Sequence, residues 1–286
     1  EAEQQNDLHQ LGLAAYAKKN FGQVSTHFET SAESRLKQLD EVKSKARQLT
    51  EEFVRDFWLA GDARYNQYEF DSALTLYQQV LRLVSKEDES WHWAFISIVI
   101  GGTNSQIGLR THGDRIHHHL GEAVTAFRDA LTVYTKDRFP QEWAATQNSL
   151  GNVLHNQGTR TGGEAGMHLL AEAVAAFREA LTVYTKDQFP QEWAGTQNNR
   201  GTVLCNQGTR TGGEVGTRLL AEAVTAYREA LTVWTKEQYS QQWAATQHNL
   251  GTVLREQSTR IGGEGSTRFL VESVTAYRAA LTVRTK

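Results

Sequence analysis

One stretch of 50 residues, Gln141 to Pro190, returns almost unchanged in the next 50 residues of the chain. Residues 141–190 and 191–240 are identical at 36 of 50 positions, and residues 91–140 and 241–286 are a weaker and a shortened copy in the same register. Three kinds of residue recur every 50 positions: Trp93, Trp143, Trp193 and Trp243; Gly101, Gly151, Gly201 and Gly251; Phe127, Phe177, Tyr227 and Tyr277. A fixed period of this length predicts an array in which each repeat packs against its neighbours.

Each copy reads as two helices joined by a loop. Proline is favoured at a helix start, so we expect the first helix to run from Pro140 to Asn156 and Gly158 to end it. Residues 159–164 are then the loop, and the second helix runs from about Gly166 to Lys186. Its apolar face is expected at Leu170, Ala173, Val174, Phe177, Ala180, Leu181 and Tyr184. No stretch predicts a strand.

The first 90 residues carry shorter units. Residues 1–34 read as a helical pair with a turn at residues 19–22. Residues 35–58 contain no glycine or proline and carry one apolar stripe, which predicts a long amphipathic helix that runs unbroken into a second short unit. The predicted domains are therefore 1–34, 35–90 and 91–286, the last divided into 91–140, 141–190, 191–240 and a truncated 241–286.

The pattern Leu150-Gly151-x-x-Leu154, followed by Ala173-x-x-x-Phe177-x-x-Ala180, resembles the tetratricopeptide repeat (TPR). Residues 5–34 and 54–87 look like ordinary units of about 34 residues. The later copies resemble the long-repeat branch of about 50 residues, because their glycine-to-alanine spacing is 22 residues rather than 12. The resemblance implies an all-α fold, a right-handed α-solenoid of tetratricopeptide-type helix pairs. It also implies a role in binding peptides or proteins, in scaffolding, or in sensing for an attached effector.

Composition narrows the classes of partner. The net charge is −3, with 30 basic and 33 acidic residues, and no basic stripe indicates nucleic acid. The longest apolar run, residues 94–100, is far shorter than the roughly 20 residues of a membrane span. Cys205 is the one cysteine, so no disulfide framework is predicted. A reducing, cytoplasmic compartment is the simpler reading, with the periplasm as an alternative.

The resemblance further implies a concave groove lined by first-helix side chains. The corresponding positions here are Asn148, Asn152, Asn156, Asn198, Thr202, Cys205, Asn206, His248, Thr252 and Arg255. An asparagine side chain offers a donor and an acceptor together, so a ladder of them can hold the backbone of an extended peptide. The alternative is that these polar residues are solvated and bridge neighbouring first helices.

Arg200 departs from the pattern of the repeats. Arg200 stands where the other copies have Ile100, Leu150 and Leu250. A guanidinium at a core position is costly unless it is paired or reaches water. We therefore expect solvent access or a carboxylate partner, from this chain or from a ligand, and Arg200 joins the groove candidates.

Residues 95–102 are apolar, which predicts either a hydrophobic pocket or a face covered by the N-terminal long helix.

The glycine-rich loops do not predict a phosphate site. They lack the Gly-Lys-Ser/Thr ending of a P-loop and follow no strand, so they read as structural turns. A row formed by Arg160, Arg210 and Arg260 along one edge could still attract an acidic partner.

No residue set predicts catalysis or a metal site. Consecutive helical residues point about 100° apart, so His117, His118 and His119 cannot share one tetrahedral ion. Cys205 has no histidine or aspartate placed as a catalytic partner, and reads as a small packed or groove residue. We expect no enzyme activity, no metal and no cofactor.

The sequence thus predicts a non-enzymatic scaffold that binds a protein or peptide on the concave face of a TPR solenoid. The alternative is a sensory or regulatory arm of a larger protein, controlling an effector domain beyond residue 286. Self-association through the exposed face of the terminal helix is a further expectation.

Overall fold

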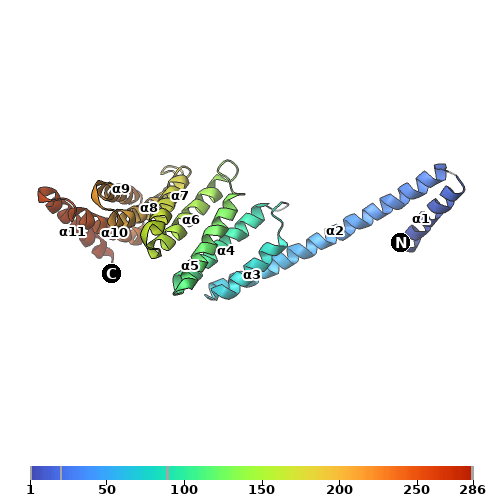
Figure 1. The fold of residues 1–286 in the computed structure, drawn as a ribbon, viewed down its shortest axis with the longest axis horizontal. Helices are drawn as coiled ribbons and strands as arrows, with labels where there is room; N and C mark the ends of the chain where they lie inside the picture. The colour runs from blue at the N-terminus through green and yellow to red at the C-terminus, as the bar shows by residue number, and fades with distance from the viewer. Residues whose placement is uncertain (1, 20, 88–89, 285–286) are drawn as a thin grey trace. The chain divides into compact units, whose positions relative to one another are not determined.

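The computed structural model describes residues 2–19, 21–87 and 90–284, and within them the chain forms helices and no strand. The predicted all-α class is confirmed. The chain divides into two compact units, residues 1–60 and 61–286, drawn in Figure 1.

The N-terminal unit contains α1 (Ala2–Ala17) and most of α2 (Phe21–Asn66). The two helices meet where the ring of Phe28 lies against the backbone of Gly12, so close that an added Cβ would be 3.0 Å from the ring. α2 is a single helix of 46 residues. It passes through residues 34 and 35 without interruption, because no glycine or proline occurs between Gly22 and Gly61. Asn20, in the predicted turn, lies outside the described residues.

The second unit begins with the last turns of α2 and continues as a series of helices. They are α3 (Phe70–Leu83), α4 (Ser90–Arg110), α5 (Asp114–Leu131), α6 (Pro140–Arg160), α7 (Gly163–Leu181), α8 (Pro190–Arg210), α9 (Gly213–Leu231), α10 (Ser240–Ser258) and α11 (Gly263–Arg284). From α3 onward each helix packs against the next one, which makes an α-solenoid (Figure 1). In the 50-residue repeats, α4, α6, α8 and α10 are first helices and α5, α7, α9 and α11 are second helices.

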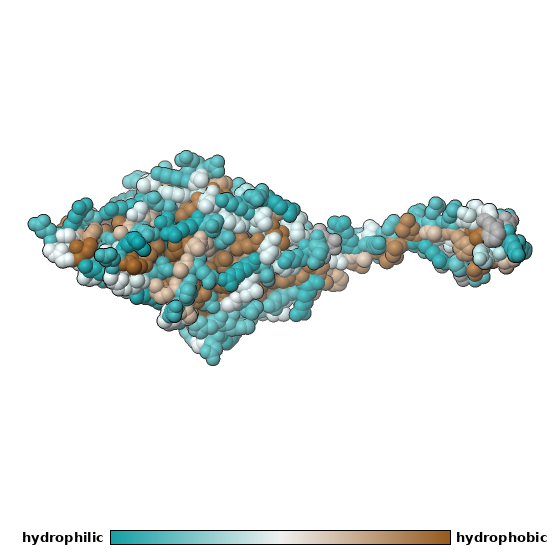
Figure 2. Space-filling view, turned by 45° about the horizontal axis from the view of Figure 1, so that its top comes forward, coloured by the Kyte–Doolittle hydropathy of each residue, from teal (hydrophilic) through white to brown (hydrophobic). Residues whose placement is uncertain are grey.

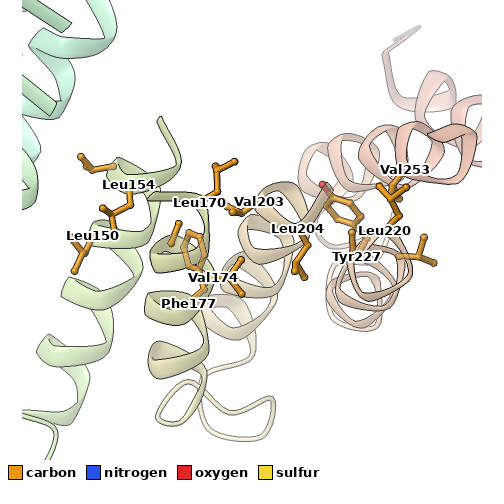
Figure 3. Packing of buried hydrophobic residues seen from close by; sticks show 14 of the residues in the cluster. Leu150, Leu154, Leu170, Val174, Phe177, Val203, Leu204, Leu220, Tyr227 and Val253 are labelled. Atoms are coloured by element: carbon orange, nitrogen blue, oxygen red, sulfur yellow. The ribbon is translucent and has the colours of Figure 1, made fainter. Parts of the chain in front are cut away.

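An aromatic ring lying on a glycine joins the two helices of each repeat. A Cβ added at Gly151 would lie 2.8 Å from the ring of Phe177, and one added at Gly201 would lie 3.0 Å from Tyr227. Ala173 and Ala180 of the second helix are fully buried, and their small side chains allow neighbouring helices to approach closely. Apolar side chains from successive helices then pack into a shared core cluster, part of which is shown in Figure 3.

The recurring tryptophans mark the junction between repeats. Each lies beneath a lysine that ends the preceding unit: Lys86 over Trp93 at 4.4 Å, Lys136 over Trp143 at 5.6 Å, Lys186 over Trp193 at 5.8 Å and Lys236 over Trp243 at 5.7 Å from the ring centre. Such cation–π contacts contribute about 0.5–1 kcal/mol each at exposed sites.

The helix ends differ from the prediction. The first helix continues past Gly158 to Arg160, and the second begins at Gly163 and ends at Leu181. Gly158 is buried against the second helix, where an added Cβ would lie 3.0 Å from both the Gly166 carbonyl oxygen and Leu170. Glycine is therefore present there for close approach of two helices and does not terminate the first one.

The apolar stretch at residues 95–102 belongs largely to the core. Ile96 and Ile100 are buried, and Ile98 packs against two core clusters. The helix that carries them, α4, packs against α3, α5 and α6. Phe95 is exposed.

Candidate binding surface

Two of the predicted groove asparagines join successive first helices. The Oδ1 atom of Asn148 in α6 accepts a hydrogen bond from Oγ1 of Thr196 in α8 at 3.2 Å. One repeat later, Oδ1 of Asn198 accepts from Thr246 in α10, also at 3.2 Å. Both threonines are buried, whereas both asparagines are only half-buried. The asparagine ladder is therefore partly a structural seam, which is the bridging role that the sequence left open.

A second bridge lies farther along the same helices. Nδ2 of Asn206 in α8 donates to Nε2 of His155 in α6 at 2.7 Å. Burial, and then the charges of Arg160 and Arg210, lower the pKa of His155 to about 4. The imidazole is therefore neutral at pH 7, which leaves Nε2 free to accept this bond.

Other asparagines on this face keep free hydrogen-bonding groups. The side-chain amides of Asn152 and Asn156 are half-buried and have no hydrogen-bond partner among the residues that the structure describes. Thr202, at the position of Asn152 in the next repeat, is instead occupied. Its Oγ1 donates to the Asn198 carbonyl at 3.1 Å and accepts from the Tyr227 hydroxyl at 3.0 Å.

The last repeat presents a different set of groups. His248 is exposed and packs against the ring of Tyr277, with 5.3 Å between the ring centres. The hydroxyl groups of Thr252 and Tyr277 share a hydrogen bond of 3.1 Å. Arg255 is exposed and pairs with Glu256 at 2.9 Å.

Arg200 is directed away from the other candidates. It donates to Oε1 of Gln197 at 2.8 Å, and Gln197 in turn donates to Glu229 of α9. Burial lowers the pKa of the guanidinium, Arg178 lowers it further, and Glu229 and Glu222 oppose the change. Its charged neighbours thus lie on second helices, and its Nε atom is buried without a partner.

Cys205 and the three consecutive histidines are the remaining candidates for chemistry. Burial raises the pKa of Cys205 to about 11, so the thiol is protonated and packs beside the main core. His119 is buried and shares a 2.9 Å hydrogen bond with Asn104, whereas His117 and His118 are exposed. Within the described ranges, no three histidine, cysteine or acidic side chains lie close enough together to hold a metal ion.

The loop arginines are occupied by backbone carbonyls. Arg210 donates to the carbonyls of Gly158 and Thr159 at 2.9 and 2.8 Å. Arg260 donates in the same way to carbonyls at residues 208, 209 and 211. Each guanidinium thus caps the C-terminal end of the preceding first helix, where cations are favoured. These bonds leave the predicted arginine row less able to attract an acidic partner.

A ladder of ion pairs that the sequence reasoning missed links successive second helices. It consists of Arg128–Glu172 at 2.6 Å, Arg178–Glu222 at 3.2 Å and Arg228–Glu272 at 2.7 Å. The signal was a constant separation of 44 residues between an arginine and a glutamate. First helices, in contrast, contact the first helix of the next repeat directly.

No protein-family model and no curated protein matches the chain. One solved structure that it resembles is the "Circular tandem repeat protein with novel repeat topology and enhanced subunit contact surfaces". The two are 14% identical with a TM-score of 0.38, over 98% of this chain and 70% of that one. Another is the "TPR2AB-domain:pHSP90-complex of yeast Sti1", with 12% identity and a TM-score of 0.25 over 98% and 100% of the two chains.

The fold is TPR-like. That assignment follows from the chain's own helix pairs, with a glycine of the first helix beneath an aromatic ring of the second in repeat after repeat. Among the described residues, no helix has both the length and the apolar character that crossing a membrane requires.

Proposed function

We propose that the array is a non-enzymatic scaffold that binds a protein or peptide segment along the face formed by α6, α8 and α10. First helices of successive repeats contact each other, whereas second helices are linked by long arginine and glutamate side chains. This difference supports an array that curves toward its first helices, with their face as the concave one. The 22-residue spacing from Gly151 to Ala173 further supports membership of the long-repeat TPR branch.

The observation that carries the proposal is the pair of free amides at Asn152 and Asn156. A polar group that loses water without gaining a hydrogen bond costs about 1–3 kcal/mol. Half-buried amides therefore favour a ligand that replaces each of their hydrogen bonds to water with a hydrogen bond of its own. The backbone of an extended peptide can do so, because it supplies both donors and acceptors. His248 and Arg255 would extend this surface into the last repeat. Arg200 joins it only if the guanidinium leaves Gln197.

The bridging asparagines are poor tests, because changing Asn148 or Asn198 also breaks the seam between helices. The sharper variant is Asn152→Ala/Asn156→Ala, which removes only free amides. The matched control is Arg218→Ala/Thr225→Ala, two exposed changes on the second helix α9. All three proteins should have the same far-UV circular dichroism.

The wild-type chain is used to select peptides from a displayed library of random linear sequences. We expect the selected peptides to bind the wild type and the control and to lose binding to the Asn152/Asn156 variant. Equal binding to all three proteins, or failure to select any peptide, would exclude this face as the binding surface.

A further inference from the structure

The central part of α2 carries large apolar side chains that are exposed. Leu39, Val42, Leu49 and Phe53 are 48%, 65%, 47% and 57% exposed. Hydrophobic residues accordingly reach the surface of this helix in Figure 2. Its internal support is short-range, as in the Arg47–Glu51 pair and the Gln48–Glu52 hydrogen bond. Such pairs contribute only about 0.2–0.5 kcal/mol each, and helices owe most of their stability to packing.

The spacing of these side chains is that of a helix-to-helix seam. Leu39, Val42, Ala46, Leu49 and Phe53 follow one another at intervals of 3, 4, 3 and 4 residues. An alternating interval of this kind places residues at the a and d positions of a heptad, which pack into a facing helix. Here Leu39, Ala46 and Phe53 are a positions, and Val42 and Leu49 are d positions.

The charges along the same segment indicate what the facing helix is. Residues 35–47 contain five basic and two acidic residues, a net charge of +3, whereas residues 48–57 contain one basic and three acidic residues, a net charge of −2. Two copies of this segment in parallel would place like charges side by side. Two copies in antiparallel orientation place each basic half against an acidic half.

We propose that α2 forms an antiparallel coiled coil with α2 of a second copy of this chain, centred between Arg47 and Gln48. In this register Ala46 faces the partner's Leu49, and Phe53 faces the partner's Val42. Each pair sets a small side chain against a large one. Lys45 lies beside the partner's Glu52, and two-fold symmetry makes this ion pair twice.

A parallel arrangement offers no such match. In parallel coiled coils each g position faces the e position five residues later in the partner. Lys45 would then face the partner's Thr50, and Glu52 would face the partner's Phe57. The antiparallel dimer is independent of the peptide site proposed above, because it uses residues 38–57 of the other unit.

The first test is the mass of the full chain in solution, by sedimentation velocity over a range of concentrations. We expect the mass to rise from 32.1 kDa toward twice that value as concentration increases. The variant Val42→Asp/Leu49→Asp buries charge in the seam, so dimerisation should weaken roughly a hundredfold or more. Both positions are exposed in the single chain, so the helical circular dichroism should persist.

The matched control is Leu270→Asp/Val274→Asp, on the exposed apolar face of α11. It should dimerise like the wild type. A chain that is monomeric at every concentration would overturn the proposal. So would a dimer that survives the α2 changes and is lost with the α11 changes, since self-association would then use the terminal helix.

The orientation has its own test. Lys45→Glu alone and Glu52→Lys alone should each weaken self-association, because each creates two like-charge contacts. An equal mixture of the two variants should form a heterodimer in which both positions hold an ion pair again, one with the original polarity and one with the polarity reversed. Mixing that restores nothing would refute the antiparallel register even if a dimer exists.

Discussion

Replacing Gly151 by alanine should destabilise the array, whereas the same replacement at Gly195 should stabilise it. At Gly151 the added Cβ would lie 2.8 Å from two atoms of the Phe177 ring, and this ring is fully buried. Overpacking of this kind costs about 2 kcal/mol, and replacing a glycine inside a helix by alanine returns about 1 kcal/mol. The net loss at Gly151 is therefore about 1 kcal/mol.

At Gly195 the added Cβ would meet only Trp234, at 3.7 Å, which is an ordinary van der Waals contact. Two of the other three copies already have alanine at this position, Ala145 and Ala245. Nothing then opposes the gain of about 1 kcal/mol from the higher helix propensity of alanine. The free energies of unfolding of the two variants should therefore differ by about 2 kcal/mol.

Urea unfolding followed by circular dichroism measures the difference, with whole curves compared because repeat arrays need not unfold in two states. A Gly151→Ala midpoint at or above that of the wild type would refute the packing argument. So would a shift of both variants in the same direction.

Three further outcomes are expected. The folded-state pKa of His155, about 4, lies below its unfolded value of 6.5, so the unfolded chain binds more protons between these values. Stability should therefore fall as pH drops from 6.5 to 4, by at most about 3 kcal/mol. His155→Gln should remove that part of the acid sensitivity, and an NMR titration that finds an ordinary pKa would contradict it. Arg260→Met should lower the free energy of unfolding by about 1–2 kcal/mol, because it removes the cap at the C-terminal end of α8. Urea unfolding measures this loss, with Arg218→Met as the control at an exposed arginine. Equal losses in the two variants would count against capping. In a double-mutant cycle, Asn148→Ala and Thr196→Val should couple by about 0.5–1.5 kcal/mol, and strict additivity would mean that the seam bond contributes nothing.

The arrangement of each repeat was predictable because one constraint determines it. A ring that recurs 26 residues after each glycine, as from Gly151 to Phe177, requires two helices in close contact. The helix ends were less predictable, since glycine has two uses in a helical protein. Gly158 reads as a terminator from sequence, and only its packing against Gly166 shows the other use. The long helix could be predicted from the sequence, because no glycine or proline occurs between Gly22 and Gly61.

The candidate surface was predictable only in part. Sequence placed the asparagines on one face, but whether an amide is free depends on what the next repeat offers 48 residues later, such as Thr196 to Asn148. The recurrence of threonine at 146, 196 and 246 was the available signal. The direction of Arg200 depends on Gln197 and Glu229, which only the packing of α8 on α9 brings near it.

The two kinds of link between repeats respond differently to solvent. The first-helix seam is made of partly buried hydrogen bonds between neutral groups, so salt should leave it almost unchanged. The second-helix ladder is made of partly exposed ion pairs, which salt screens within a Debye length of about 8 Å at physiological ionic strength. The seam between first helices is therefore the more constant link, and the ion-pair ladder between second helices is the link that salt weakens. We therefore expect added salt to widen the separation of successive second helices more than that of first helices, so that the pitch of the array changes with ionic strength.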